Sequence, residues 1–481
     1  MIDEETTAAL AGHHRACHRR LATTTAGILA GARHDHPALP RAAGGSTAGQ
    51  VSPGSTGSTD PGRCPRHRRA PSPRQPETSQ TLPQARAARY CQRVAERVGL
   101  VVSGGGARGA YEAGAITSLL PRLGRPPTIL VGTSAGALTV TGLAADAHLG
   151  LDQAAEHVVS RWSSVALDDV FGVVSSIAGG GLRYLGQLAG LHVRLSSLFD
   201  TTRMTETITK LVPFERVHEN IERGIVEAVA VAATSVATGG TVVFVEKHPA
   251  IELPRYDANR NISYVETELR PEHVLASAAV PGLFRPIHIG TPPAWAGWYV
   301  DGGLRLNMPL KPAVQMGADR LGMVSTRPRH WPTGLPSQQH TGTGEPDIFN
   351  AAGVILRAML ADRMVEDLHR LESRNAQAHA DPGGAPFRHI DVEFAGPPLE
   401  RADALAVLAD EVFRQRYRGL RRLRHPQLSV LARFIGGEAT DRGGLLSFLF
   451  FDPAFTVPAA ALGRADGRLR LHRPRTTGRN A

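Results

Sequence analysis

The chain has 481 residues, enough for two or three domains, and a formal net charge of +10. Arg outnumbers Lys by 51 to 3, a ratio typical of high-GC coding, so the basic balance alone does not indicate a specific nucleic-acid partner. The three cysteines, Cys17, Cys64 and Cys91, have neither metal-ligand spacing nor the pattern of a disulfide framework. Composition therefore argues against a disulfide-rich or cysteine-ligated metal protein.

Residues 1–97 predict a disordered, basic arm. They contain 14 Arg and no Lys against seven acidic residues, a net charge of +7. Long runs of Ala, Gly, Ser, Thr and Pro leave too little apolar surface to offset the entropy of folding. The arm either contacts anionic lipid or nucleic acid, or is a leader without specific partners. Because the first residues are acidic and no apolar segment follows, we expect no secretory signal.

A glycine-rich turn follows the first strong strand signal. Gly99–Ser103 predicts a strand, Gly104–Gly109 a turn and Ala110–Leu120 a helix. The G-x-G-x-x-G spacing also fits a dinucleotide-binding loop, but the next strand ends in Gly-Thr-Ser instead of an acidic residue. A P-loop is excluded because no Gly-Lys-Ser/Thr follows. The remaining interpretation is an oxyanion hole, in which the N–H groups of Gly104, Gly105 and Gly106 stabilise a tetrahedral acyl intermediate. Arg108 either adds positive charge to this hole or fixes the loop.

A second glycine turn carries a serine. The apolar strand Thr128–Val131 runs directly into Gly132-Thr133-Ser134-Ala135-Gly136, and the small-residue run to Ala145 predicts a helix. This strand–turn–helix context is the one that a nucleophile elbow requires. Two turns that follow consecutive parallel strands lie at the same edge of a sheet. We therefore expect Ser134 to lie beside the glycine loop and to act as a nucleophile, supported by Gly109, Gly132 and Gly136.

A serine nucleophile requires a base. The histidines at 273, 288, 330 and 389 are candidates, but none lies in a glycine-bounded loop after a strand. The segment Trp298–Gly303 is a better candidate because an aromatic and β-branched strand ends there in Asp301-Gly302-Gly303. A carboxylate within hydrogen-bonding distance of the serine can take its proton directly.

Together, these residues resemble the patatin-like acyl hydrolases. The family's Gly-Gly-Gly-x-Arg-Gly loop, Gly-x-Ser-x-Gly elbow and Asp-Gly-Gly/Ala turn occur here in the family's order, and the segment Ala276–Pro286 is also similar. The similarity covers about Val98 to Arg327. It implies a three-layer α/β/α fold with a mostly parallel central sheet and a Ser134–Asp301 dyad. The implied substrates are lipid acyl esters.

The rest of the chain predicts further elements around this core. Strands are expected at 225–234, 241–245, 321–325 and 387–394, and helices at 348–371 and 402–423, with a surface loop at 331–347. The apolar, glycine-containing stretch Val170–Phe199 is either a cap that admits lipid chains or ordinary core. Leu445–Phe451 is strongly apolar and either docks the C-terminal region on the core, which we expect, or contacts a membrane. We expect four parts, namely the arm (1–97), the patatin-like core (98–330), a C-terminal α/β extension (331–463) and a basic flexible tail (464–481).

The sequence thus predicts an acyl-ester hydrolase of the phospholipase A or lysophospholipase type. The alternatives are a neutral-lipid or short-chain carboxylesterase with the same dyad, and a membrane-binding scaffold with incidental activity. No His/Cys/Asp cluster is present, so we expect no metal and no cofactor. The expected partners are a lipid substrate and a membrane surface, without specific nucleic acid. The expected location is the cytoplasm, with peripheral association to membranes.

Overall fold

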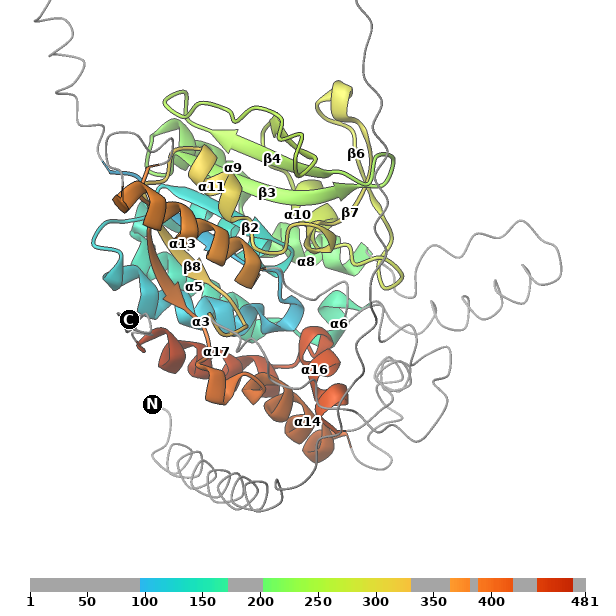
Figure 1. Ribbon diagram of the computed structural model, residues 1–481. Coiled ribbons are helices and arrows are strands. Elements are labelled where there is room, and N and C mark those ends of the chain that lie inside the picture. The colour runs from blue at the N-terminus through green and yellow to red at the C-terminus, as the bar shows by residue number, and fades with distance from the viewer. Residues whose placement is uncertain (1–95, 172–201, 330–363, 381–387, 418–438, 470–481) are drawn as a thin grey trace, which may run out of the picture. The chain divides into compact units, whose positions relative to one another are not determined.

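The computed structural model describes residues 96–171, 202–329, 364–380, 388–417 and 439–469 (Figure 1). The predicted arm lies outside these residues up to residue 95, as do the predicted loop at 331–347 and most of the predicted cap. In the described residues, a nine-stranded mixed sheet is the centre of the fold. Its strands are β1 (Val98–Val102), β2 (Ile129–Thr133), β3 (Ala228–Ser235), β4 (Thr241–Lys247), β5 (Ile262–Glu266), β6 (Ile287–Ile289), β7 (Gly297–Asp301), β8 (Arg320–Val324) and β9 (Asp391–Ala395).

The main path of the sheet has the order β5-β4-β3-β2-β1-β8-β9. The strands β3, β2, β1, β8 and β9 are parallel to one another, whereas β4 is antiparallel to β3. The first strand is buried along its whole length, as its continuous apolar sequence VGLVV predicts for a strand that helices cover on both faces. A mostly parallel sheet between helical layers is the architecture that the sequence predicts, and it is confirmed.

The helices lie on both faces of the sheet (Figure 1). One hydrophobic core lies between the sheet and the layer that includes α3, α4, α5 and α10, and the other lies under α11 and α13. The helices of the first part are α3 (Gly109–Leu119), α4 (Ala135–Asp146), α5 (Leu151–Ser164), α6 (Leu167–Val170), α8 (Thr202–Leu211), α9 (Phe214–Glu222), α10 (Pro271–Ser277) and α11 (Leu310–Gln315). Those of the second part are α13 (Met364–Ala380), α14 (Ala404–Arg416), α16 (Ala439–Leu449) and α17 (Pro453–Gly467).

The C-terminal helices pack on the first helical layer. α17 lies along α3, where the hydroxyl of Tyr111 donates a hydrogen bond of 2.8 Å to Asp466. Asp466 also forms an ion pair with Arg401. The predicted flexible tail begins at Arg464, but α17 continues to Gly467 because Asp466 and Gly467 are buried against α3. The apolar run 445–451 is the end of α16 and the turn that leads to α17.

An unusual junction at the carboxyl edge of the sheet determines where the site forms. β4 occupies one side of β3 along its length, from Ala228 to Thr234. On the other side, β2 pairs with β3 only as far as Ala232, and β7 pairs antiparallel with the next residues, from Ala233 to Ser235. β7 therefore approaches the end of β2 head-on. The last residue of β7, Asp301, meets the residue that follows β2.

Candidate active site

Ser134 forms the sharp turn between β2 and α4. Its φ of 56° and ψ of −122° lie in a region that side chains other than glycine avoid, at a cost of about 1–3 kcal/mol. The turn is tight enough that a Cβ at Gly132 would overlap the carbonyl group of Gly136, and one at Gly136 would overlap that of Val102. Glycine is therefore required on both sides of the serine, and the hydroxyl of Ser134 is exposed to the pocket described below.

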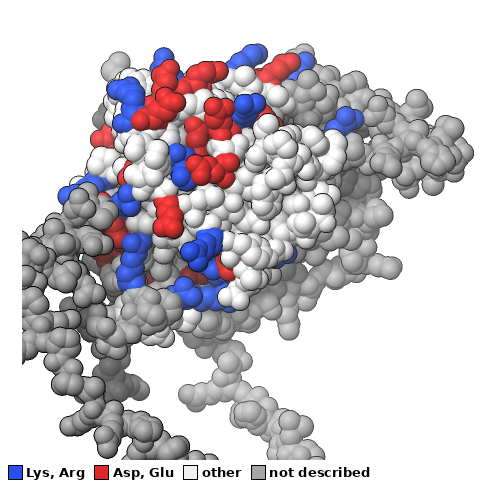
Figure 2. Space-filling model, turned by 90° about the horizontal axis from the view of Figure 1, so that it is seen from above, with Lys and Arg blue, Asp and Glu red and all other residues white. Residues whose placement is uncertain are grey.

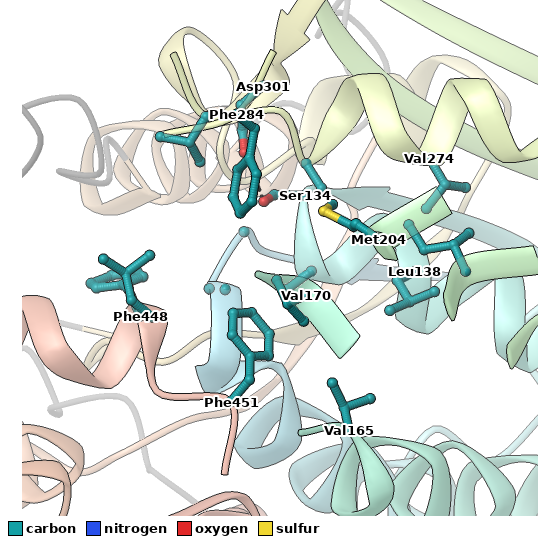
Figure 3. A pocket seen from close by; sticks show the side chains of 18 of the residues that line it. Ser134, Leu138, Val165, Val170, Met204, Val274, Phe284, Asp301, Phe448 and Phe451 are labelled. Atoms are coloured by element: carbon teal, nitrogen blue, oxygen red, sulfur yellow. Dashed lines mark hydrogen bonds between the residues drawn. The ribbon is translucent and has the colours of Figure 1, made fainter. Parts of the chain in front are cut away.

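Ser134 and Asp301 contact one another directly (Figure 3). The Ser134 hydroxyl donates a hydrogen bond of 2.8 Å from Oγ to Oδ2 of Asp301. The other carboxylate oxygen, Oδ1, accepts the N–H of Gly303 at 2.6 Å, which fixes the orientation of the carboxylate. A Cβ at Gly302 would overlap the carbonyl oxygen of Ala232, so the Asp-Gly-Gly turn also needs its first glycine.

The protonation of Asp301 is shifted strongly by its surroundings. Burial raises the pKa of Asp301 from 3.8 to about 7, while the hydrogen bonds from Gly303 and Ser134 lower it and do not offset burial. A carboxyl group with a pKa near 7 is a far better proton acceptor than an ordinary aspartate and is still largely ionised slightly above neutral pH. Asp301 can therefore accept the proton of the serine hydroxyl.

No described histidine lines the pocket at this serine. His273 is buried in α10, where Nδ1 accepts the N–H of Arg270 at 3.0 Å and the ring lies against Phe244. His288 is exposed on β6, and His389 contacts Asp391 at the start of β9. His330 lies outside the described residues.

The glycine loop lies beside Ser134, as the sequence predicts, but its three N–H groups are not equivalent. The N–H of Gly104 donates to Asn307, at 3.2 Å to the carbonyl oxygen and 3.1 Å to Oδ1. The N–H groups of Gly105 and Gly106 make no hydrogen bond to any residue that the structure describes, and both residues line the pocket with Ser134. Two of the three predicted donors are thus free to bind an anion at this wall.

Arg108 has a different place from the one that an oxyanion hole requires. Its guanidinium donates to Oγ of Ser447 at 2.8 Å and to the carbonyl oxygen of Gly444 at 2.9 Å, and lies 3.9 Å from the centre of the Phe448 ring. Burial, with a smaller contribution from Arg327, lowers the pKa of Arg108 to about 9. Arg108 does not line the pocket. Its hydrogen bonds connect the glycine loop to α16. Of the two roles considered from the sequence, this corresponds to fixing the loop.

Two positioning residues were not predicted from the sequence. The hydroxyl of Ser277, at the end of α10, accepts a hydrogen bond from the backbone N–H of Ser134. The side chain of Asn307 accepts one from the N–H of Gly104 and so fixes the glycine loop. A buried serine in the otherwise apolar segment from 274 to 280 is a weak signal for such a role. Nothing local in the sequence distinguishes Asn307 from an ordinary loop residue.

An apolar pocket opens at Ser134 and has a volume of about 80 Å³. Figure 3 shows Leu138, Val165, Val170, Met204 and Val274 on one side of it and Phe448 and Phe451 on another. Of the predicted cap, only Val170 and Phe171 are described, and Val170 is part of the pocket wall. The C-terminal apolar run also contributes to the wall, so this segment encloses the site as well as docking on the core.

Among the described residues, no group of His, Cys, Asp and Glu side chains is arranged to hold a metal ion. No single helix among the described residues is long and apolar enough to span a membrane. By length and composition alone, a span could be formed by one pair of helices, bent by 101° between them, at Gly443–Leu449 and Pro453–Gly467.

A comparison with solved structures matches 16 chains, and two of them show how distant the similarity is. VipD from Legionella pneumophila is 16% identical, with a TM-score of 0.25, and the alignment covers 64% of each chain. A human GIVD cytosolic phospholipase A2, in complex with methyl γ-linolenyl fluorophosphonate, is 13% identical with a TM-score of 0.28. That alignment covers 78% of this chain and 60% of the phospholipase chain, so less than two thirds of either solved chain is matched. At these TM-scores no inference about this chain follows from either structure.

A comparison with curated proteins finds no match. The model of the patatin-like phospholipase family matches residues 100–314, a little less than half of the chain. This range includes the glycine loop, the serine turn and the aspartate turn, and it ends within α11. Residues 100–314 are therefore a patatin-like phospholipase domain with the α/β fold of that family.

Proposed function

We propose that the chain is a lipid acyl hydrolase of the phospholipase A or lysophospholipase type, with Ser134 as nucleophile and Asp301 as base. The observation that carries this proposal is the 2.8 Å hydrogen bond from the serine hydroxyl to a carboxylate whose pKa burial has raised to about 7. Support also comes from the strained serine turn at the wall of an apolar pocket.

In the proposed reaction, Asp301 Oδ2 takes the proton of Ser134 as Oγ attacks the ester carbonyl carbon. The oxygen of the tetrahedral intermediate accepts hydrogen bonds from Gly105 and Gly106, each worth about 3–4 kcal/mol in the transition state. When the C–O bond to the alcohol breaks, Asp301 returns the proton to the leaving oxygen. A water molecule then attacks the acyl-enzyme with Asp301 as base, and the fatty acid and the free serine are formed.

The pocket supports an apolar acyl group as the part of the substrate next to Ser134. Its walls are aliphatic and aromatic side chains from α4, α5, α8, α10 and the end of α16. Such walls favour hydrocarbon over a charged or hydrated group by roughly 25 cal/mol for each Å² of apolar surface removed from water.

A second candidate is a short-chain or neutral-ester esterase that uses the same dyad. The volume of about 80 Å³ favours it, since pockets for larger ligands usually have about 300–1,000 Å³. Long-chain lipids require the pocket walls to separate. The membrane scaffold alternative is disfavoured because binding alone needs no strained serine and no raised aspartate pKa.

The test is fatty-acid release from mixed phospholipid vesicles, lysophospholipids and soluble short-chain esters by wild type, Ser134→Ala and Asp301→Ala. Matched controls are Ser263→Ala, on β5 away from the pocket, and Asp152→Asn, which is exposed on α5. The proposal predicts release that both site variants lose and both controls keep, with unchanged circular dichroism. Release that persists in Ser134→Ala would contradict the mechanism. Hydrolysis of short esters alone would favour the second candidate.

A further inference from the structure

The hairpin formed by β6 and β7 projects beyond the carboxyl edge of the sheet. β7 pairs with β3 only at Ala233–Ser235, beyond the residues of β3 that pair with β2. The backbone N–H of Val236 continues this pairing by donating to the carbonyl oxygen of Trp298 at 2.9 Å. From Pro286 to Val300 the chain contains no Lys, Arg, Asp or Glu. The hairpin lies at the top of the molecule in Figure 1. Figure 2 shows the molecule from that side, and its surface includes a broad area without charged side chains.

Large apolar side chains are exposed on this hairpin. Trp295 at the tip is 36% exposed, Trp298 on β7 is 55% exposed, and the neighbouring Val236 is 54% exposed. The ring of His288 lies edge-on to that of Trp298, with 5.1 Å between their centres. Tryptophan is the residue that prefers the boundary between lipid headgroups and acyl chains, because the ring is mostly apolar and carries one N–H donor.

Several backbone groups at the tip of the hairpin are absent or already hydrogen-bonded. Pro292 and Pro293 have no N–H group, and the N–H groups of Trp295 and Ala296 are bonded to the carbonyl groups of these prolines. The carbonyl oxygen of Trp295 accepts the hydroxyl of Tyr299 at 2.7 Å. Each unpaired backbone group costs free energy on leaving water, so these bonds lower the cost of placing the tip against a lipid layer.

Both ends of the hairpin are continuous with the pocket. Leu283 and Phe284 line the pocket just before β6, and Asp301 lines it at the end of β7. Arg285, between the pocket-lining Phe284 and β6, is exposed and forms no ion pair with a described residue. The hairpin therefore connects its exposed tip to two segments of the pocket wall, and Arg285 provides a cation beside it for an anionic phosphate.

We propose that the β6–β7 hairpin docks the protein on a phospholipid surface, with Trp295 and Trp298 at headgroup depth and Arg285 at the lipid phosphates. This inference rests on the proposed function, since it assigns the lipid surface from which that same site takes its substrate. Docking through this hairpin places the lipid surface against the strand that ends in Asp301.

The test measures binding without hydrolysis, in the Ser134→Ala background, by cosedimentation with vesicles of phosphatidylcholine, with and without phosphatidylglycerol. The double change Trp295→Ala/Trp298→Ala is expected to lower the partition coefficient about tenfold or more. Its control is Leu399→Ala/Val407→Ala, which removes side chains that are 40% and 55% exposed near and on α14, at the other end of the molecule in Figure 1. The change Arg285→Ala is expected to weaken binding about fivefold to vesicles that contain phosphatidylglycerol, and less to phosphatidylcholine alone, whose phosphate is balanced by the choline cation.

A second pair of variants guards against misfolding. Ala294→Asp places one charge on the exposed tip and should abolish binding, whereas Ala376→Asp places the same charge on an exposed position of α13 and should not. Equal binding by tip and control variants would overturn the proposal. So would the absence of binding to both vesicles, or a tryptophan-dependent dimer in sedimentation without lipid. Because soluble-ester hydrolysis by the wild type is read separately, failure of docking and failure of the proposed chemistry give different results.

Discussion

The hydroxyl of Ser277 accepts a hydrogen bond of 2.8 Å from the backbone N–H of Ser134. The same hydroxyl donates to the carbonyl oxygen of Ala232 at 2.6 Å, so it connects the serine turn to β3 at the last residue that pairs with β2. Ser277 is fully buried. It therefore holds the backbone of a residue whose φ is unfavourable, and it leaves the Ser134 hydroxyl free to bond Asp301.

Removing this tie should weaken both the fold and the site. In Ser277→Ala the buried N–H of Ser134 loses its partner, which costs about 1–3 kcal/mol in the free energy of unfolding. We expect kcat/KM for a soluble ester to fall about tenfold as the serine turn relaxes. Urea unfolding and ester kinetics measure the two effects. The control is Ser325→Ala, whose buried hydroxyl accepts the N–H of Arg327 and which should lose stability alone.

The pH dependence of catalysis should follow the carboxyl group of Asp301. Only the ionised form can take the proton of Ser134, and burial raises its pKa to about 7. We expect kcat/KM for a soluble ester to rise with pH and to reach half its maximum near pH 7. An ordinary, exposed aspartate would place this midpoint at about pH 4. A profile that is flat between these values would contradict the assignment of Asp301 as base.

The same shift predicts how stability depends on pH. Because folding raises the pKa of Asp301 from 3.8 to about 7, the folded state holds a proton that the unfolded state releases. The stability that the neutral carboxyl group contributes is complete below about pH 4 and is lost as the pH rises through 7. The side chain of Asn cannot ionise, so the free energy of unfolding of Asp301→Asn at pH 8 should exceed that of the wild type by up to about 4 kcal/mol. Urea unfolding at several pH values measures this difference. A difference that does not change with pH would contradict this.

Gly106 should be required for contact between the glycine loop and α16. Its φ is 56°, and a Cβ there would overlap the carbonyl oxygen of Phe448. Gly239, with a φ of 62° and open space around it, is the matched control. Gly239→Ala should cost about 1–2 kcal/mol. Gly106→Ala should cost about 1–3 kcal/mol more and reduce ester hydrolysis, because it displaces Phe448 and the loop donors. Equal losses of stability in urea unfolding would show that the contact with α16 is unimportant.

The sequence predicts the parts of the site that local patterns specify. Each of the two glycine turns follows a short apolar strand and precedes a helix, and parallel strands bring such turns to the same edge. The sequence alone indicates the Asp301 turn as a candidate, but not how it reaches Ser134. That contact depends on β7 pairing antiparallel with the last residues of β3, where β2 has already ended. Strand order across such a distance has no local signature.

The remaining parts of the site come from distant segments. Phe448 and Phe451 form a wall of the pocket more than 300 residues after the serine turn, and an apolar run does not reveal what it will cover. Arg108 lies in the motif, but its guanidinium donates to Ser447 and Gly444 of α16, and no local pattern indicates these distant acceptors. Asn307 accepts a hydrogen bond from the N–H of Gly104. The glycine motif alone would assign that N–H group to the oxyanion hole.

The most direct test of the central claim is covalent modification by a fluorophosphonate, followed by peptide mass spectrometry. The account predicts one phosphonyl group on Ser134 in the wild type, none in Ser134→Ala, and labelling slowed at least about 100-fold in Asp301→Asn, because the base that activates the hydroxyl is absent. Modification of a different residue, or labelling of Asp301→Asn at the wild-type rate, would contradict the Ser134–Asp301 dyad.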